Sequence, residues 1–565
     1  MKKIIAIQIL ICMLFQVPAQ LLEKETIIDL SKKDSRFSAF YGFPNEVIVN
    51  DQNQQFELVY VNKVKRKSIK RNRLVFDYDL NLISDHSEEI EVRGYDANQT
   101  TVKTDAAKMP ANYKGEDYTT TMLTLGGLMN NKIEKTEAKY DYNWTSRTYD
   151  VETKVIEKVK AKELVGKTMQ NPYVLHYNNA AGDLLYVSGT LNKKRLVVDA
   201  YKVHRIKPNM ESEVVAEWSF DYVQRHFFGG WFLTETGDVN MILIFANAGG
   251  KVYKPKVNQA PKPNEWTYVR LSSKGELMNK ASFKTKANNW QILGAYEKDG
   301  SVYVYGPGES KGVNEKHQDI LAAIGTGKQD VFQILKITDD NVDFVTGPTL
   351  DEINQLSVKP AGQKKKVEYD GKRVAFGNLN IAPNRDIFIN AQDWSLDARS
   401  TKPLYKSLLM FQFAADGTFK RLYGIESQKE KAGIGGAIDP DTDPRFFQDQ
   451  GQVFAGPNGN MFWNTFTVNQ INKYVSKWTE GSIEYTQTTI VKRFTGAIAK
   501  FDPESGTLED YQKLGDDKFL LYALPSEGIP SISIDGGKKK IFLGYGSTKD
   551  TKNQIWLGKL DPAKL

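Results

Sequence analysis

The stretch Asp299-Gly300-Ser301-Val302-Tyr303-Val304-Tyr305 decides the fold. Its Asp-Gly pair predicts a tight turn, and the aliphatic and aromatic run that follows predicts a buried strand. The same turn and strand recur at Gly182-Asp183, Gly237-Asp238, Asn384-Arg385-Asp386, Asn458-Gly459 and Gly536-Gly537. Counted from Asp183 through Asp238, Gly300, Arg385, Gly459 and Gly537, the copies lie 55, 62, 85, 74 and 78 residues apart. One structural unit is therefore repeated along the chain.

A second hairpin follows most of these strands. Leu408–Phe413 leads to a turn at Asp416-Gly417, and Trp266–Leu271 leads to a turn at Lys274-Gly275. Two hairpins make a four-stranded sheet, and blades of about 40 to 50 residues with insertions fit the observed intervals. We therefore expect an all-β protein, a β-propeller of six to eight four-stranded blades with seven as the expected number.

The repeat indicates a single propeller domain over residues 20–565. A further copy begins near Phe56, and the last strand, Ile555–Leu560, is expected to pair beside N-terminal strands and close the ring. Residues 97–170 depart from the repeat and are expected to be an insertion, in which Val151, Val155 and Val159 recur at helical spacing. Residues 309–328 are typical of a short helix. Several β-sandwich domains in tandem are the alternative, although they predict no recurrent two-hairpin unit.

Residues 1–19 have the features of a signal peptide. Lys2 and Lys3 precede an apolar stretch, Ile4–Phe15, that is too short to span a bilayer, and cleavage is expected after Ala19. The only cysteine, Cys12, lies in this leader, so the mature chain cannot form disulfides. We expect a periplasmic protein, with an extracellular location as the alternative and lipidation of Cys12 as a weaker one.

Composition limits the classes of partner. Lys plus Arg number 76 against 69 Asp plus Glu, and this mild excess over 565 residues does not indicate a nucleic-acid binder. No later window has the length of a membrane helix, so no transmembrane segment is expected.

Local motifs for catalysis or metal binding are weak. The five histidines lie far apart, and the acids of Asp439–Asp443 resemble a calcium loop whose sharp-turn position is occupied by Pro444. A propeller enzyme needs only a few converging carboxylates, and the candidates are Asp221, Glu235, Asp393 and Asp397. Tryptophans that could stack on sugar rings are Trp144, Trp218, Trp231, Trp290, Trp394 and Trp463, although most are expected in the core. We assign no catalytic residue, metal or cofactor.

A dense basic segment is the one candidate contact surface. Seven of the eleven residues from Lys63 to Arg73 are basic, namely Lys63, Lys65, Arg66, Lys67, Lys70, Arg71 and Arg73. Such a cluster favours an acidic partner through screened Coulomb attraction. The alternative is a hairpin tip that charge keeps soluble.

Through turns such as Asp299-Gly300 and Asp416-Gly417, the chain resembles exported bacterial β-propeller proteins. The resemblance concerns architecture and matches no specific family. It implies a rigid platform for protein partners and, less often, a glycosidase, lyase or dehydrogenase. We therefore expect a non-catalytic periplasmic scaffold, or an accessory subunit of an outer-membrane or secretion assembly, that binds a protein of the cell envelope. The alternative is a glycan-binding or polysaccharide-degrading propeller protein.

Overall fold

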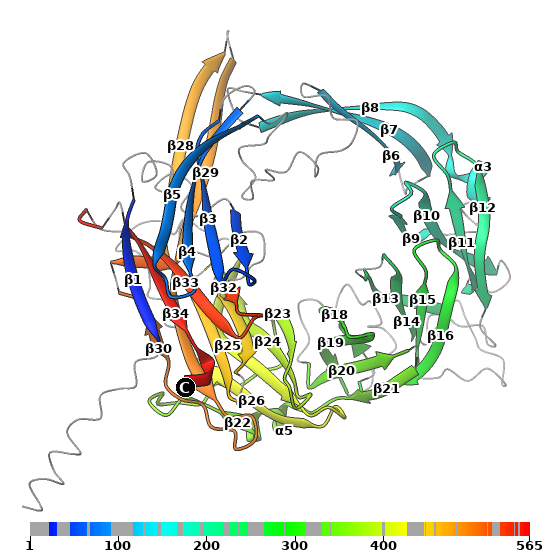
Figure 1. Cartoon of the computed structure of the whole chain (residues 1–565). Helices are drawn as coiled ribbons and strands as arrows, with labels where there is room; N and C mark the ends of the chain where they lie inside the picture. The colour runs from blue at the N-terminus through cyan, green and yellow to red at the C-terminus, as the bar shows by residue number, and fades with distance from the viewer. Residues whose placement is uncertain are drawn as a thin grey trace, which may run out of the picture.

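The computed structural model shows an all-β protein (Figure 1). It describes residues 22–564 apart from 31–45, 65–67, 92–116, 128–130, 144–147, 167–172, 193–196, 220–224, 235–236, 247–264, 288, 311–328, 340, 398–401, 427–445, 447, 457–458, 481–482, 517, 522–530, 547–548 and 552–553. Within these residues the helices are α3 (Ala161–Val165), α5 (Leu350–Gln355) and the 3-10 turn η4 (Pro562–Lys564). The predicted helix at 309–328 lies almost entirely outside the described residues.

The first half of the chain forms four antiparallel sheets. The first sheet contains β2 (Glu46–Asn50), β3 (Gln55–Val64), β4 (Ser68–Asp77) and β5 (Leu82–Glu91). The second contains β6 (Asp117–Gly126), β7 (Lys132–Asn143) and β8 (Thr148–Lys160). The third contains β9 (Tyr173–Asn178), β10 (Leu184–Asn192), β11 (Val197–Ile206) and β12 (Ser212–Ser219). The fourth contains β13 (Arg225–Leu233), β14 (Val239–Ala246), β15 (Glu265–Leu271) and β16 (Leu277–Lys284).

The second half continues the series with larger sheets. One sheet contains β17 (Asn289–Trp290), β18 (Gly294–Lys298), β19 (Ser301–Glu309), β20 (Val331–Thr338) and β21 (Asn341–Thr346). The next contains β22 (Ser357–Val358), β23 (Val374–Ile381), β24 (Ile387–Leu396), β25 (Pro403–Phe413) and β26 (Phe419–Ile425). The last sheet joins β1 (Lys24–Asp29) to β27 (Gln450–Ala455), β28 (Met461–Glu480), β29 (Ile483–Phe501), β30 (Gln512–Leu514), β31 (Phe519–Leu521), β32 (Ser531–Ile534), β33 (Lys539–Gly546) and β34 (Gln554–Leu560).

The predicted turns lie where the repeat placed them. The described residues of the six recurrent turns end no more than one residue before a strand, namely β10, β14, β19, β24, β28 and β33. At the first of the quoted stretches, Lys298 pairs with Ser301, so Asp299 and Gly300 form a two-residue hairpin loop. Both residues have positive φ, 51° and 75°, as a type I′ turn requires.

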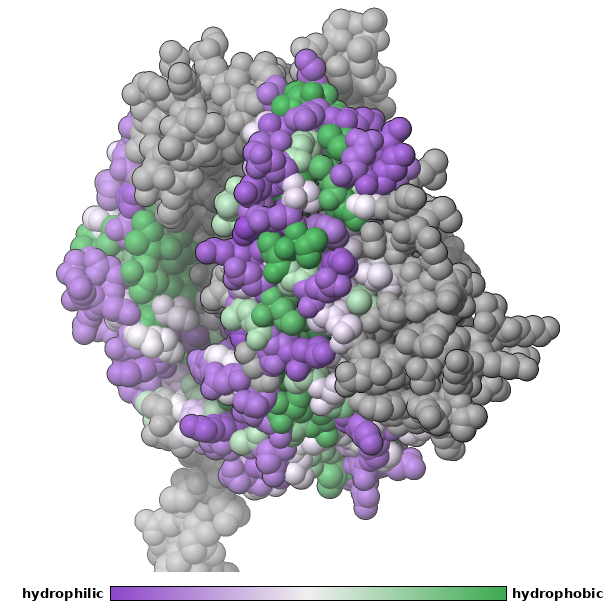
Figure 2. Space-filling model, turned by 90° about the vertical axis from the view of Figure 1, so that its right-hand side faces the viewer, coloured by the Kyte–Doolittle hydropathy of each residue, from purple (hydrophilic) through white to green (hydrophobic). Residues whose placement is uncertain are grey.

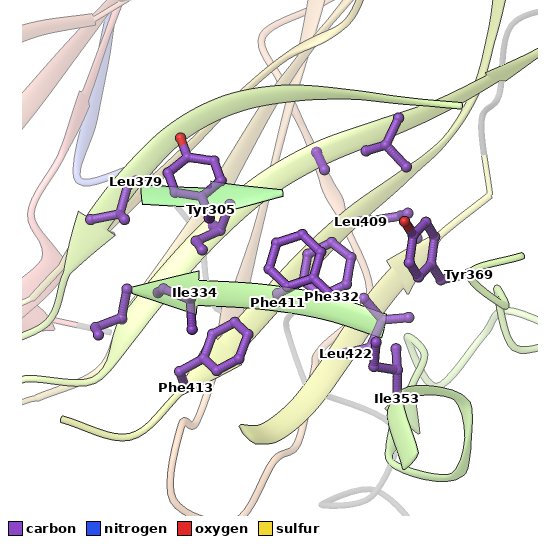
Figure 3. Packing of buried hydrophobic residues seen from close by; sticks show 14 of the residues in the cluster. Tyr305, Phe332, Ile334, Ile353, Tyr369, Leu379, Leu409, Phe411, Phe413 and Leu422 are labelled. Carbon is purple, nitrogen blue, oxygen red and sulfur yellow. The ribbon is translucent and has the colours of Figure 1, made fainter. Parts of the chain in front are cut away.

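From the β6–β8 sheet onward, each described sheet packs against the next one in the chain, which is consistent with blades of a propeller. The largest cluster joins the β17–β21 and β22–β26 sheets, where the rings of Phe332 and Phe411 stack with centroids 4.4 Å apart (Figure 3). Similar buried clusters lie between other consecutive sheets, and a further cluster joins the β2–β5 sheet to the last sheet. In Figure 1 the sheets follow one another around a common centre, with β13 on the inner side and β16 on the outer side.

The two ends of the chain meet in one sheet, as predicted. Strand β1 pairs antiparallel with β34, from Lys24 opposite Lys559 to Asp29 opposite Gln554. Lys559 is only 4% exposed and contacts Glu23 at 3.1 Å and Asp79 at 2.9 Å. The pairing therefore links the N-terminal segment to the last strand through both backbone and charge.

The helical spacing in region 97–170 was misread. Val151, Val155 and Val159 lie on strand β8, which pairs along its length with β7. A spacing of four occurs in strands as well as in helices, so the pattern does not distinguish the two, and a register shift between Val155 and Glu157 interrupts the alternation along β8. The described part of the region is the three-stranded β6–β8 sheet followed by the short helix α3.

The outer surface is mixed in polarity. Figure 2 shows hydrophobic residues scattered among hydrophilic ones on the side of the molecule that includes the outer strands β12 and β16. Val214, Leu277 and Met278 are exposed apolar side chains on these strands. No helix in the described ranges is long and apolar enough to cross a membrane.

Candidate functional site

Among the four acids selected from the sequence, the structure brings two to one end of the β22–β26 sheet. Asp393 and Asp397 lie on or directly after β24, whereas Asp221 and Glu235 lie outside the described residues. Asp397 closes the hairpin, because its N–H donates to the carbonyl of Lys402 at 3.0 Å. Asp393 is the acid with unusual surroundings.

A β-bulge sets the position of Asp393. Gln392 lies opposite Leu408 and Trp394 lies opposite Tyr405, so Asp393 alone faces both Lys406 and Ser407 on β25. A bulge releases backbone groups from the ladder and re-aims nearby side chains. Here the freed N–H of Ser407 donates to the Asp393 carboxylate.

The carboxyl group of Asp393 is partly buried and incompletely bonded. Its Oδ1 is shielded from solvent and has no hydrogen-bond partner in the described part of the chain. Burial raises the pKa of Asp393 to about 6, and the nearby Asp370 adds to the rise, while the charge of Lys406 and the Ser407 N–H oppose it. Both protonation states are therefore populated near neutral pH.

Other polar groups surround this end of the sheet. The Arg373 guanidinium lies over the Trp394 ring, 5.3 Å from its centroid. The backbone N–H of Trp394 donates to the Arg373 carbonyl at 3.1 Å. Burial also raises the pKa of Tyr405, the register partner of Trp394. The Asp393 carboxyl group and the Arg373–Trp394 contact lie at the same end of the sheet, but Val374 is the register partner of Asp393 on β23, so the two occupy alternate positions along the strands.

Gln392, the residue before the bulge, connects the site to the next sheet. Its amide nitrogen donates to the Lys406 carbonyl at 2.9 Å and to Asp449 Oδ2 at 3.2 Å, and its oxygen accepts from the Asp449 N–H at 2.8 Å. Sequence reasoning missed both Gln392 and Asp449. A bulge and a contact across 57 residues leave no local signature that could have revealed them.

The predicted basic segment is the β3–β4 hairpin. Lys63 pairs with Lys70 in register, and Lys65, Arg66 and Lys67 lie outside the described residues. Lys70 and Arg71 have Glu89 and Glu88 as register partners on β5. Of the seven basic residues, only Arg73 has a described side chain, and its guanidinium contacts Glu57 and, at 2.7 Å, Glu88. The charge of Arg73 is therefore already paired with acids of the same sheet. Partner binding by the segment stays a prediction.

Of the remaining candidates, the tryptophans and the acids of 439–443, the structure describes only some. Trp218, Trp290 and Trp463 are buried as expected, Trp231 is 39% exposed, and Trp144 lies outside the described residues. The acids of 439–443 also lie outside them. Among the residues that the structure describes, no group of three or more His, Cys, Asp or Glu could hold a metal ion.

No protein-family model and no curated protein matches this sequence. Solved structures with propeller-like or all-β folds do match. Lignostilbene dioxygenase from Pseudomonas brassicacearum is 10% identical with a TM-score of 0.28, covering 79% of this chain and 86% of its own. A Synechocystis apocarotenoid oxygenase mutant is 9% identical with a TM-score of 0.24, covering 88% and 94%. The GH43_1 enzyme from Xanthomonas citri, complexed with xylotriose, is 8% identical with a TM-score of 0.19, covering 64% and 98%.

These findings correct the expectation of a non-catalytic scaffold or accessory subunit. That expectation is wrong because it took a repeated all-β architecture without local catalytic motifs as a sign of a binding role, and the similar structures include enzymes. Catalytic groups in such folds converge from different strands, so local motifs are not required. At this level of similarity no substrate or activity is carried over to this chain.

Proposed function

We propose that this protein is an enzyme that uses Asp393 as an acid–base group on a small polar substrate. The observation that carries the proposal is the geometry at the β24–β25 bulge. There a partly buried carboxyl group accepts from the backbone N–H groups of Ser407 and of Asp393 itself, and keeps one oxygen without a hydrogen-bond partner among the described residues. Asp386 and Asp238 are bonded to cations, whereas Asp393 has no ion pair in the described part of the chain.

The surroundings suit proton transfer. A pKa of about 6 lets Asp393 accept or donate a proton under mildly acidic to neutral conditions. The charged groups that act on the carboxyl are Lys406 and Asp370, so its protonation responds to charge as well as to burial. The Ser407 N–H fixes the carboxylate, so little reorientation is needed when the substrate binds.

The test uses the full chain and the matched variants Asp393→Asn and Asp397→Asn. Chromogenic 4-nitrophenyl esters and phosphates are offered from pH 4 to pH 9. We expect turnover that depends on a group titrating near pH 6, a loss of about 100-fold or more in Asp393→Asn, and little change in Asp397→Asn. No turnover by the wild-type protein, or equal turnover in Asp393→Asn, contradicts the proposal.

We further propose that residues 20–565 form one propeller of six to eight blades, with seven expected, and that residues 97–170 are an insertion in it. The recurrent turn and strand units and the β1–β34 pairing support the single domain. We also propose that residues 1–19 are removed on export and that the mature protein is periplasmic or extracellular. The mass of the exported protein tests this directly, because a chain that begins at Gln20 is expected and an acyl group on Cys12 is not.

A further inference from the structure

Gln392 is held more completely than any packing role requires. It is fully buried, and both atoms of its amide are bonded, to the Lys406 carbonyl on β25 and to the backbone and side chain of Asp449. Asp449 is itself only 4% exposed and directly precedes β27 in the next sheet. A bonded pair in this setting fixes the separation between the two sheets and the orientation of the groups that it contacts.

The contact with Lys406 lies at the bulge itself. Lys406 and Ser407 are the two residues of β25 that face Asp393 alone. The carbonyl of Lys406 binds Gln392, and the N–H of Ser407 binds the Asp393 carboxylate. The backbone groups that the bulge releases are thus divided between two consecutive side chains of β24.

From this arrangement we infer that Asp449 and Gln392 are positioning residues, which hold the β24–β25 bulge open and thereby orient the Asp393 carboxyl group from the neighbouring sheet. The inference rests on the proposed function of Asp393. Without the Asp449 carboxylate, the Gln392 amide nitrogen loses its bond to Oδ2, and only the backbone N–H of residue 449 still anchors Gln392 across the sheet boundary. Asp393 would then turn toward solvent, which removes the main cause of its raised pKa.

The experiment measures the pKa of Asp393 from the side-chain carboxyl carbon in full-length protein labelled at aspartate, with Asp393→Asn used to assign its resonance. In Asp449→Ala we expect the pKa to fall by about one unit or more, because solvation favours the carboxylate. Both variants keep the backbone N–H of residue 449, but Asp449→Asn also retains a side-chain acceptor oxygen for the Gln392 amide, so it should rescue the pKa to within about 0.3 unit of the wild-type value.

The chain offers a matched control at the other end of the same sheet. Asp386 is 3% exposed, and its Oδ2 accepts from the Gln412 amide at 2.7 Å, which repeats the Asp–Gln pairing without a contact to the bulge. Asp386→Ala should therefore leave the pKa of Asp393 unchanged. An equal shift in this control, or a wild-type pKa in Asp449→Ala, overturns the inference.

A second variant keeps the inference testable if Asp449→Ala does not fold. Gln392→Met keeps the length of the side chain and removes its hydrogen bonds, so the pKa of Asp393 should again fall, and an unchanged value rejects the positioning role. The readout does not depend on turnover. If the pKa of Asp393 shifts but Asp393→Asn keeps full activity, the enzyme proposal is rejected and the positioning inference stands. If the pKa does not shift but Asp393→Asn loses activity, the positioning inference is rejected and the enzyme proposal stands.

Discussion

Replacing His204 with glutamine should remove a pH dependence from the stability of the fold. His204 lies on β11, is 6% exposed, and its Nε2 is 3.3 Å from the hydroxyl of Ser188. Burial lowers its pKa from 6.5 to about 4, with a smaller contribution from the charge of Lys202. The side chain is therefore neutral in the folded protein over a range in which it is protonated in the unfolded chain.

The sign and size of the effect follow from this difference. Between pH 6.5 and pH 4 the unfolded chain binds more protons at this position than the folded chain, so the free energy of unfolding falls as the pH falls. With these two pKa values, His204 alone lowers the free energy of unfolding by about 2 kcal/mol between pH 7 and pH 5. The contribution is fully present above pH 6.5 and is lost as the pH approaches 4.

Urea unfolding followed by tryptophan fluorescence at pH 7 and pH 5, at constant ionic strength, measures this term. Wild-type protein should lose about 2 kcal/mol more than His204→Gln, whose amide can still bond to Ser188 but does not titrate. His86→Gln removes an exposed histidine on β5 and serves as the matched control, with the wild-type pH dependence expected. If wild-type protein and His204→Gln lose the same stability, the reasoning from burial is refuted.

Two further substitutions test the closure and the core. Lys559→Met removes a buried cation from Glu23 and Asp79, so it should destabilise the protein by about 1 to 3 kcal/mol and speed amide exchange in β1. Unchanged exchange in β1 would show that charge does not hold the terminal strands together. Phe411→Ala leaves a cavity beside Phe332 in the largest cluster, so it should lower the free energy of unfolding by about 3 to 5 kcal/mol, measured by thermal unfolding. A decrease of less than about 1 kcal/mol would mean that the cluster collapses to fill the space.

The repeat was predictable because each unit carries its own local chemistry. Asp299 and Gly300 adopt positive φ in a two-residue turn, and this preference belongs to the residues themselves whatever the rest of the chain does. Gly417 shows the same dependence on a single residue, since it has a φ of 84° and a Cβ there would come within 2.5 Å of the Phe344 ring. Each turn of this kind can therefore be predicted from its own residues, without knowledge of the rest of the fold.

The candidate site was not predictable in this way. Asp393 was one of several acids in the sequence, and its distinction arises from a bulge whose residues, Lys406 and Ser407, have no special composition. Its connection to Asp449 depends on how two sheets meet. The number of residues on β25 opposite Asp393, and the burial that follows, are properties of pairing and packing that no single segment encodes.

Two other buried acids, Asp386 and Asp238, differ from Asp393 because each has a direct cation. Asp386 lies 2.9 Å from the Lys420 ammonium, and Asp238 lies 3.0 Å from the Arg270 guanidinium and accepts from the Ser273 N–H. Each of these acids lies at the turn before a central strand, where a cation from the same sheet balances its charge and the pair fixes the turn. Asp393 lies near the far end of its strand and receives a backbone N–H, with Lys406 acting only through its field. Protonation of Asp386 or Asp238 would break an ion pair, whereas protonation of Asp393 breaks none in the described part of the chain, so a change of protonation costs less at the bulge than at those two acids.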